Sequence, residues 1–183
     1  LKFIKINMGI PLYFKTISNK YPDIIIDIDK IQDINGLFLD LNCAIHPCCR
    51  RVIQDGYKNH KKNQYEKRMI HEVLNYIDKL VRLIQPSMVF MAIDGVAPAA
   101  KMQQQRLRRF KSIVERNETN KIKEKFNEPY NKDFWDTNAI SPGTECMQKL
   151  SDCIVNHIKI NEIYKPLDVI FSNASVPGVG EHK

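Results

Sequence analysis

Residues 88–98 have the sequence MVFMAIDGVAP. The first six are apolar and partly β-branched, which predicts a strand buried on both faces of a parallel sheet. The apolar run ends at Asp94, and Gly95 and Pro98 then interrupt any regular structure. A carboxylate at the end of a buried strand is a candidate functional residue, so Asp94 is a candidate site residue.

A basic segment follows this strand. Residues 99–125 lack glycine and proline and are rich in Gln, Arg, Lys and Glu, which predicts a long helix. They hold nine Lys or Arg against three Asp or Glu, so most of the chain's net charge of +7 is concentrated here. A concentrated basic stripe favours a polyanionic partner, and the alternative is a solvated helix face.

The rest of the chain alternates strands and helices. Apolar runs predict further strands over 37–41 and 167–171, and helical spacing of apolar residues predicts a helix over 66–84. A second helix is predicted from Pro142 through residue 158, after a loop over 127–141. This alternation predicts an α/β fold, a mostly parallel central sheet flanked by helices.

Three acids follow predicted strands. Asp40 and Asp94 lie at strand ends, and Glu181 lies in a Gly-rich loop after the last strand. The carboxyl ends of parallel strands share one edge, so we expect the three side chains to converge there. Their repulsion would be relieved by Mg²⁺ or Mn²⁺, which prefer oxygen ligands. The alternatives are a helix cap or turn for each Asp and an exposed loop position for Glu181.

The basic helix carries candidate anion ligands. Lys101, Gln105 and Arg108 share one helix face and Arg109 is adjacent, so together they are predicted to enclose a terminal phosphate. The alternative is again a solvated face. His46 either stacks on a base or fills a polar corner, and the sequence leaves these two roles equal.

The cysteines indicate the redox state of the cellular compartment in which the protein is expected. There are five, an odd number without a repeating spacing, and no signal-peptide segment precedes them. We therefore expect reduced thiols in an intracellular compartment, the cytoplasm or nucleus. No apolar run approaches the roughly 20 residues that span a bilayer, so no membrane partner is expected.

Several blocks of sequence occur in a distinctive order. They are Met8-Gly9-Ile10-Pro11, Leu39-Asp40-Leu41-Asn42 with Ile45-His46, Asp94-Gly95-Val96-Ala97-Pro98 with Ala100-Lys101-Met102 and Gln104-Gln105-Arg106, Ser141-Pro142-Gly143-Thr144-Glu145, and Pro177-Gly178-Val179-Gly180-Glu181-His182-Lys183. This pattern resembles the N-terminal part of the XRN-type 5′→3′ exoribonucleases. The resemblance covers residues 8–183, so residues 1–7 are expected to be an extension outside the domain.

The resemblance implies a fold and an activity. The fold is a PIN or flap-nuclease-like core, incomplete at its C-terminus, and the activity is Mg²⁺-dependent hydrolysis of single-stranded RNA from a 5′-monophosphate end. The residues that match the family's catalytic, metal-binding carboxylates are Asp40, Asp94 and Glu181. Those that match its 5′-phosphate pocket are Lys101, Gln105, Arg108 and Arg109, and His46 matches a residue that stacks on the terminal base.

The chain also departs from the family pattern. Val179 stands where the family has a glutamate, and Ala99 stands where it has an arginine. The chain stops at Lys183, before further aspartates of the family's metal site. One alternative is therefore a truncated, catalytically inactive nucleic-acid-binding remnant, and another is that a further chain supplies the missing region. A third is a DNA-directed 5′ nuclease related to flap endonucleases.

Overall fold

The structure, a computed structural model, divides into two compact units, residues 1–34 and 35–183. The residues that it describes are 12–27, 34–56, 62–128, 135–180 and 183. The first unit contains α1 (Tyr13–Lys20) and the 3₁₀ helix η1 (Pro22–Ile24), neither of which has a buried residue. The expected domain start at residue 8 lies outside the described residues, and the candidate site lies in the second unit.

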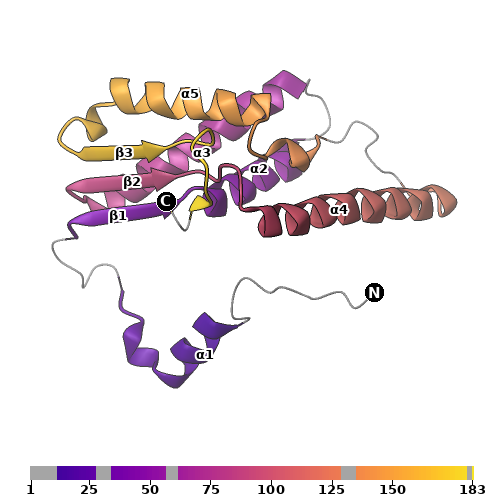
Figure 1. Cartoon of the computed structure of the whole chain (residues 1–183), viewed down its shortest axis with the longest axis horizontal. Helices are drawn as coiled ribbons and strands as arrows, with labels where there is room; N and C mark the ends of the chain where they lie inside the picture. The colour runs from indigo at the N-terminus through magenta and orange to yellow at the C-terminus, as the bar shows by residue number, and fades with distance from the viewer. Residues whose placement is uncertain (1–11, 28–33, 57–61, 129–134, 181–182) are drawn as a thin grey trace. The chain divides into compact units, whose positions relative to one another are not determined.

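The second unit is built on a parallel sheet. Its strands are β1 (Gly36–Asp40), β2 (Met88–Ala92) and β3 (Asp168–Ser172), in the spatial order β1-β2-β3 (Figure 1). Each lies within one residue of the predicted strand, so the α/β class is confirmed. All three carboxyl ends meet at one edge of the sheet, which is where ligands bind in open α/β sheets.

The helices agree with the sequence in part. They are α2 (Asn42–Gly56), α3 (Lys62–Ile84), α4 (Ala99–Lys125) and α5 (Glu145–Ile160), with short 3₁₀ helices η3 (Thr137–Ala139) and η4 (Glu162–Tyr164). The predicted helices over 66–84 and 99–125 are confirmed, the first with an additional turn. The predicted loop over 127–141 contains η3, while residues 129–134 lie outside the described part of the chain.

The start of α5 corrects one expectation. Pro142 is not in its first turn, because Gly143 follows with a φ of +82° that ends any helical path. The N-cap is Thr144, whose Oγ1 accepts a hydrogen bond of 3.4 Å from the backbone N–H of Met147. Thr144 therefore satisfies one of the free N–H groups that begin a helix.

The sequence analysis missed α2, which carries His46. Pro47 lies inside this helix and is exposed. Proline removes one backbone donor and disfavours a helix interior. Its destabilising effect is offset here by the apolar face of α2, where Ile45, Cys48 and Val52 are buried. That spacing, at every third or fourth residue, was the signal that the proline obscured.

The hydrophobic core lies on one face of the sheet, under α2, α3 and α5 (Figure 1). In β2 the alternate residues Val89 and Met91 are fully buried there. On the opposite face Phe38, Phe90 and Ile170 stand in register across the three strands, and Phe38 is 68% exposed. Within the second unit, the described helices cover the first face, and on the opposite face Phe90 is half-buried while Ala92 is buried. The predicted burial of β2 on both faces is therefore met only in part within this unit.

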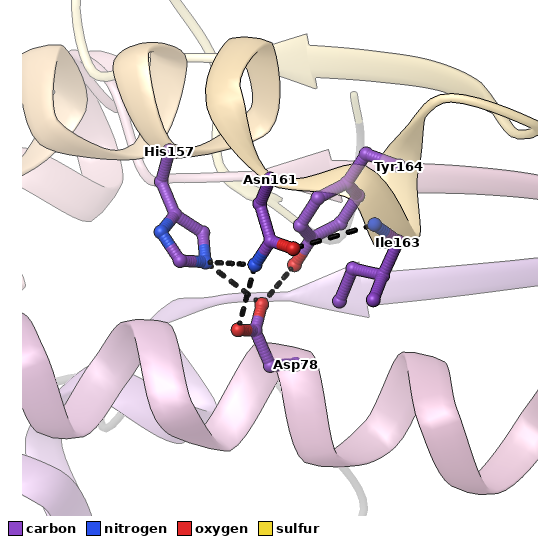
Figure 2. Close-up of polar contacts among 5 residues, drawn as sticks. All are labelled: Asp78, His157, Asn161, Ile163 and Tyr164. Atoms are coloured by element: carbon purple, nitrogen blue, oxygen red, sulfur yellow. Dashed lines mark hydrogen bonds and ion pairs between the residues drawn. The ribbon is translucent and has the colours of Figure 1, made fainter.

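A polar cluster fixes the helices at the other edge of the sheet, near the amino ends of the strands. Figure 2 shows Asp78 of α3 accepting hydrogen bonds from Tyr164 Oη at 2.7 Å and from Asn161 Nδ2 at 3.0 Å. His157 Nε2 lies 2.9 Å from the same carboxylate. Burial, and secondarily the hydrogen bond to Asp78, raises the pKa of Tyr164. The cluster holds α5 and η4 on α3 and so sets where β3 begins.

Among the described residues, no helix combines the length and the apolar composition needed to cross a membrane.

Candidate functional site

Two of the predicted acids meet at the carboxyl edge of the sheet. Asp40 is the last residue of β1, and Asp94 lies two residues beyond β2. Asp94 Oδ1 accepts a hydrogen bond of 2.7 Å from the backbone N–H of Gly180, and a Cβ added to Gly180 would lie 2.7 Å from Asp40 Oδ1. One glycine therefore contacts both carboxylates. Glu181, the third predicted acid, lies outside the described residues.

The loop after β3 is held against the loop after β2 by its backbone. Gly95 N donates to Gly178 O at 2.8 Å, and Gly178 N donates to Val96 O at 3.0 Å. A Cβ on Gly95 would lie only 1.9 Å from Val176 O, so no side chain fits there. Gly95 thus permits the close approach that brings Gly180 to Asp94.

Asp40 also has a local structural role. Its Oδ1 accepts a hydrogen bond of 3.1 Å from Asn42 N, and Cys43 Sγ lies 3.5 Å from its Oδ2. The alternative predicted from the sequence, a turn residue before a helix, therefore describes part of what Asp40 does. Asp94 does not cap a helix, because the N-cap of α4 is Pro98.

Lys183 is a further charged group at this edge that the sequence analysis did not single out. Its Nζ donates to Ile93 O at 2.7 Å and to Asn173 O at 2.8 Å, beyond the carboxyl ends of β2 and β3. Burial lowers the pKa of Lys183, and the neighbouring Asp94 opposes that effect. Nothing in the local sequence distinguishes this lysine from the chain's other basic residues.

A cavity of about 630 Å³ opens beside Asp94. Its α2 wall includes Asn42, His46 and Arg50, and its α4 wall includes Gln105, Arg108 and Arg109. The structure thus places His46, Asp94 and three of the four predicted phosphate ligands around one space. Lys101, the fourth, is not among the residues that line the cavity. Arg50 and Asn42 line it although the sequence analysis did not select them.

The cavity is positively charged. Its lining contains three arginines and one aspartate, a net charge of +2 when His46 is neutral. Desolvation lowers the pKa of His46, and the nearby Arg50 lowers it further, while Asp94 acts in the opposite sense. The imidazole is therefore mainly uncharged at neutral pH, which suits a ring that stacks on a base.

The donor atoms at the sheet edge suit a hard cation. Mg²⁺ is commonly held by one or two carboxylates together with water and substrate phosphate, and Asp40 and Asp94 provide such a pair. Asn42 Oδ1 is buried without a hydrogen-bond partner in the described structure, so it is available to accept from a bound water. No group of three or more His, Cys, Asp or Glu suited to a metal occurs in the described part of the chain. Val179 is buried and apolar and adds no ligand.

Comparison with known proteins shows which family this sequence matches. Residues 8–183 match the sequence family described as XRN 5′-3′ exonuclease N-terminus. The chain is 35% identical over 213 residues to the 5′-3′ exoribonuclease 2 of Gallus gallus, an alignment covering 96% of this chain and 22% of that protein. It is 38% identical over 184 residues to the 5′-3′ exoribonuclease 1 of Saccharomyces cerevisiae, covering 96% of this chain and 12% of that protein.

A third relative is the 5′-3′ exoribonuclease 2 homolog of Drosophila melanogaster, 34% identical over 215 residues, 96% of this chain and 23% of that protein. The chain thus spans between 12% and 23% of the lengths of these three relatives. The match to the family, by contrast, runs through both loops that form the carboxyl edge of the sheet and through all of α4. The chain belongs to the XRN 5′-3′ exonuclease family, whose N-terminal part it matches.

Proposed function

We propose that the protein acts as a 5′→3′ exoribonuclease on single-stranded RNA that carries a 5′-monophosphate. The observation that supports this most directly is the cavity that joins Asp94 to arginines of two helices at the carboxyl edge of the sheet. A basic recess beside paired carboxylates suits a terminal phosphate next to the bond to be cut. The relatives named as 5′-3′ exoribonucleases support the same reaction.

Recognition of the RNA end follows from the cavity walls. Arg108 and Arg109 present planar, permanently charged guanidinium groups, which bind phosphate oxygens in bidentate fashion. Gln105, one turn earlier on α4, adds an uncharged donor. The neutral ring of His46 on the opposite wall supplies a flat surface for the terminal base. Lys101 remains a candidate phosphate ligand only through the family resemblance.

Hydrolysis is assigned to the carboxyl edge of the sheet, where Asp94 lines the cavity and Asp40 lies beside Gly180. Asp40 and Asp94, together with Glu181, would hold Mg²⁺, with Mn²⁺ as an alternative. When bound, such an ion supplies Lewis-acid polarisation of the phosphate and a more acidic water. The chain fixes the carboxylates beforehand, because Asn42 N holds Asp40 and Gly180 N holds Asp94. Lys183 places a positive charge near Asp94, which favours the ionised form of that carboxylate.

A second candidate function is RNA binding without cleavage. The observation that favours it is Val179, which is only 2% exposed. It lies in the loop after β3, directly before Gly180, the residue that contacts Asp40 and Asp94. A buried valine neither binds a cation nor replaces the carboxylate that the family resemblance predicts at this position. In that case the basic cavity would still bind RNA ends.

One assay separates these functions. The purified protein is incubated with 3′-labelled single-stranded RNA bearing a 5′-monophosphate or a 5′-hydroxyl, in Mg²⁺, in Mn²⁺ and in EDTA. A nuclease should shorten the phosphorylated RNA from its 5′ end in metal only. Matched single-stranded DNA tests the alternative of a DNA-directed enzyme.

Two substitutions of the same type provide the control. Asp94→Asn should lower the rate by about 10² or more, by analogy with the removal of one transition-state ligand. Asp168→Asn should leave it unchanged, because Asp168 is exposed at the amino end of β3, at the opposite edge of the sheet. RNA that is bound but stays intact would favour the second candidate. The absence of both cleavage and binding would refute both candidates.

A further inference from the structure

Two adjacent arginines of α2 differ in their surroundings. Arg50 and Arg51 are both exposed. Arg51 Nη1 lies 3.9 Å from Glu72 Oε2, so Arg51 forms an ion pair with the neighbouring helix α3. Arg50 instead lines the cavity, and the described residues form no ion pair with it. The sequence Arg-Arg gives no indication of this difference.

Arg50 faces the same space as the groups assigned to RNA recognition. It follows His46 by four residues, so the two side chains share one face of α2. Both line the cavity, and the charge of Arg50 acts on the His46 ring. Arg108 and Arg109 of α4 line the same cavity, also without an ion pair in the described structure. Positive groups from two helices thus surround one recess.

Such an arrangement favours binding of an anion of matching charge. Three guanidinium groups repel one another, and the single carboxylate in the lining leaves a net charge of +2. A terminal phosphate monoester carries roughly −1.5 to −2 at pH 7. An internal phosphodiester carries about −1. Without Arg50 the recess would have a net charge matching the diester, and with it the charge matches the monoester.

We propose that Arg50 is a further phosphate-binding residue, which makes the cavity select a 5′-phosphate monoester over a 5′-hydroxyl end. It contributes from α2, whereas Arg108 and Arg109 contribute from α4. This inference rests on the proposed function and adds a residue to its phosphate pocket.

The test is a binding measurement in EDTA, which keeps the RNA intact whatever the activity of the protein. Dissociation constants are measured by fluorescence anisotropy for one RNA oligonucleotide with a 5′-monophosphate and for the same RNA with a 5′-hydroxyl. Arg50→Ala should lower the ratio of the two affinities by about tenfold, the loss of one charge-assisted hydrogen bond. Arg50→Lys should keep part of the preference, because it retains the charge without the planar fork.

The neighbouring arginine is the matched control. Arg51→Ala removes the same side chain and charge from the same helix, and it should leave the affinity ratio unchanged. Both positions are exposed and alanine favours helices, so both variants should fold, which melting curves check. An unchanged ratio in Arg50→Ala overturns the inference, and so does an equal loss in Arg51→Ala, which would indicate a general charge effect.

Arg108→Ala separates this inference from the proposed function. If Arg108→Ala lowers the ratio and Arg50→Ala does not, the role of Arg50 fails while the phosphate pocket stands. If the unmodified protein shows no preference for the 5′-phosphate, or if neither variant changes that preference, the proposed pocket and the role of Arg50 fail together.

Discussion

Gly95→Ala should destabilise the protein through steric contact alone. Gly95 is buried and its φ lies outside the left-handed region, so alanine would have no conformational penalty there. Its methyl group, however, would lie 1.9 Å from Val176 O and 2.9 Å from the carbonyl carbon of the same residue. Backbone atoms cannot rotate out of the way, so the loop after β3 must move by roughly 1.5 Å to reach ordinary contact distance.

That movement breaks the hydrogen bonds that hold the loop. Gly95 N–Gly178 O at 2.8 Å and Gly178 N–Val96 O at 3.0 Å are neutral bonds, each contributing about 0.5–1.5 kcal/mol. Gly180 N–Asp94 Oδ1 at 2.7 Å has a charged acceptor and contributes about 1.5–3 kcal/mol. Since part of the loop is exposed and water replaces some of these bonds, we expect the free energy of unfolding to fall by about 3 kcal/mol.

Urea denaturation measures this loss, as a shift of about 1–2 M in the midpoint. Gly143→Ala is the matched control, because Gly143 has the reverse properties. Its φ is +82° and a Cβ there would meet nothing within 4 Å, so only the backbone conformation is penalised, by about 1 kcal/mol. A loss in Gly95→Ala equal to or smaller than that in Gly143→Ala would refute the steric argument and the loop placement behind it.

Two further predictions concern ionisable groups. Val179→Glu should lower the melting temperature in EDTA, because a carboxylate would be buried near Asp40 and Asp94. Adding Mg²⁺ should raise the melting temperature of this variant by more than it raises that of the unmodified protein. An equal response of both proteins to Mg²⁺ would count against a metal site between the acids. Tyr164→Phe should cost about 1 kcal/mol at pH 7, by removing the hydrogen bond to Asp78. The pKa of Tyr164 is raised from its ordinary value of 10.0, so its contribution is complete below pH 10 and is lost as the pH rises further. Denaturation at several alkaline pH values should therefore show a steeper loss in the unmodified protein than in Tyr164→Phe, and parallel curves would contradict the assignment.

Local patterns accounted for much of the fold. The run 88–93 predicted β2 because continuous apolar residues mark a parallel strand, and helical spacing over 66–84 predicted α3. Residues 99–125 matched α4 at both ends, since no proline or glycine interrupts them. The helix α2 was missed because Pro47 argues locally against it, and packing of its apolar face outweighs that local effect.

The acids illustrate the limit of prediction for the site. The parallel sheet predicts that Asp40 and Asp94 share an edge, and the structure brings both against Gly180. Gly180 contacts both carboxylates only because Gly95 leaves space for the loop after β3. The spacing of residues in the sequence does not predict this contact. Lys183 was missed for a similar reason, because its partner Ile93 O lies 90 residues away in the sequence.

The sequence by itself determined the strands, most helices, the places of Asp40 and Asp94 at the sheet edge, the basic character of α4 and the family resemblance. These features depend on periodicity and residue type, which act over a few neighbouring residues. The tertiary structure alone decided that Arg50 faces the cavity while Arg51 pairs with Glu72, and that Gln105 lines the cavity while Lys101 does not. Which side of a helix faces a site depends on its rotation against elements far away in the chain, and long-range packing sets that rotation.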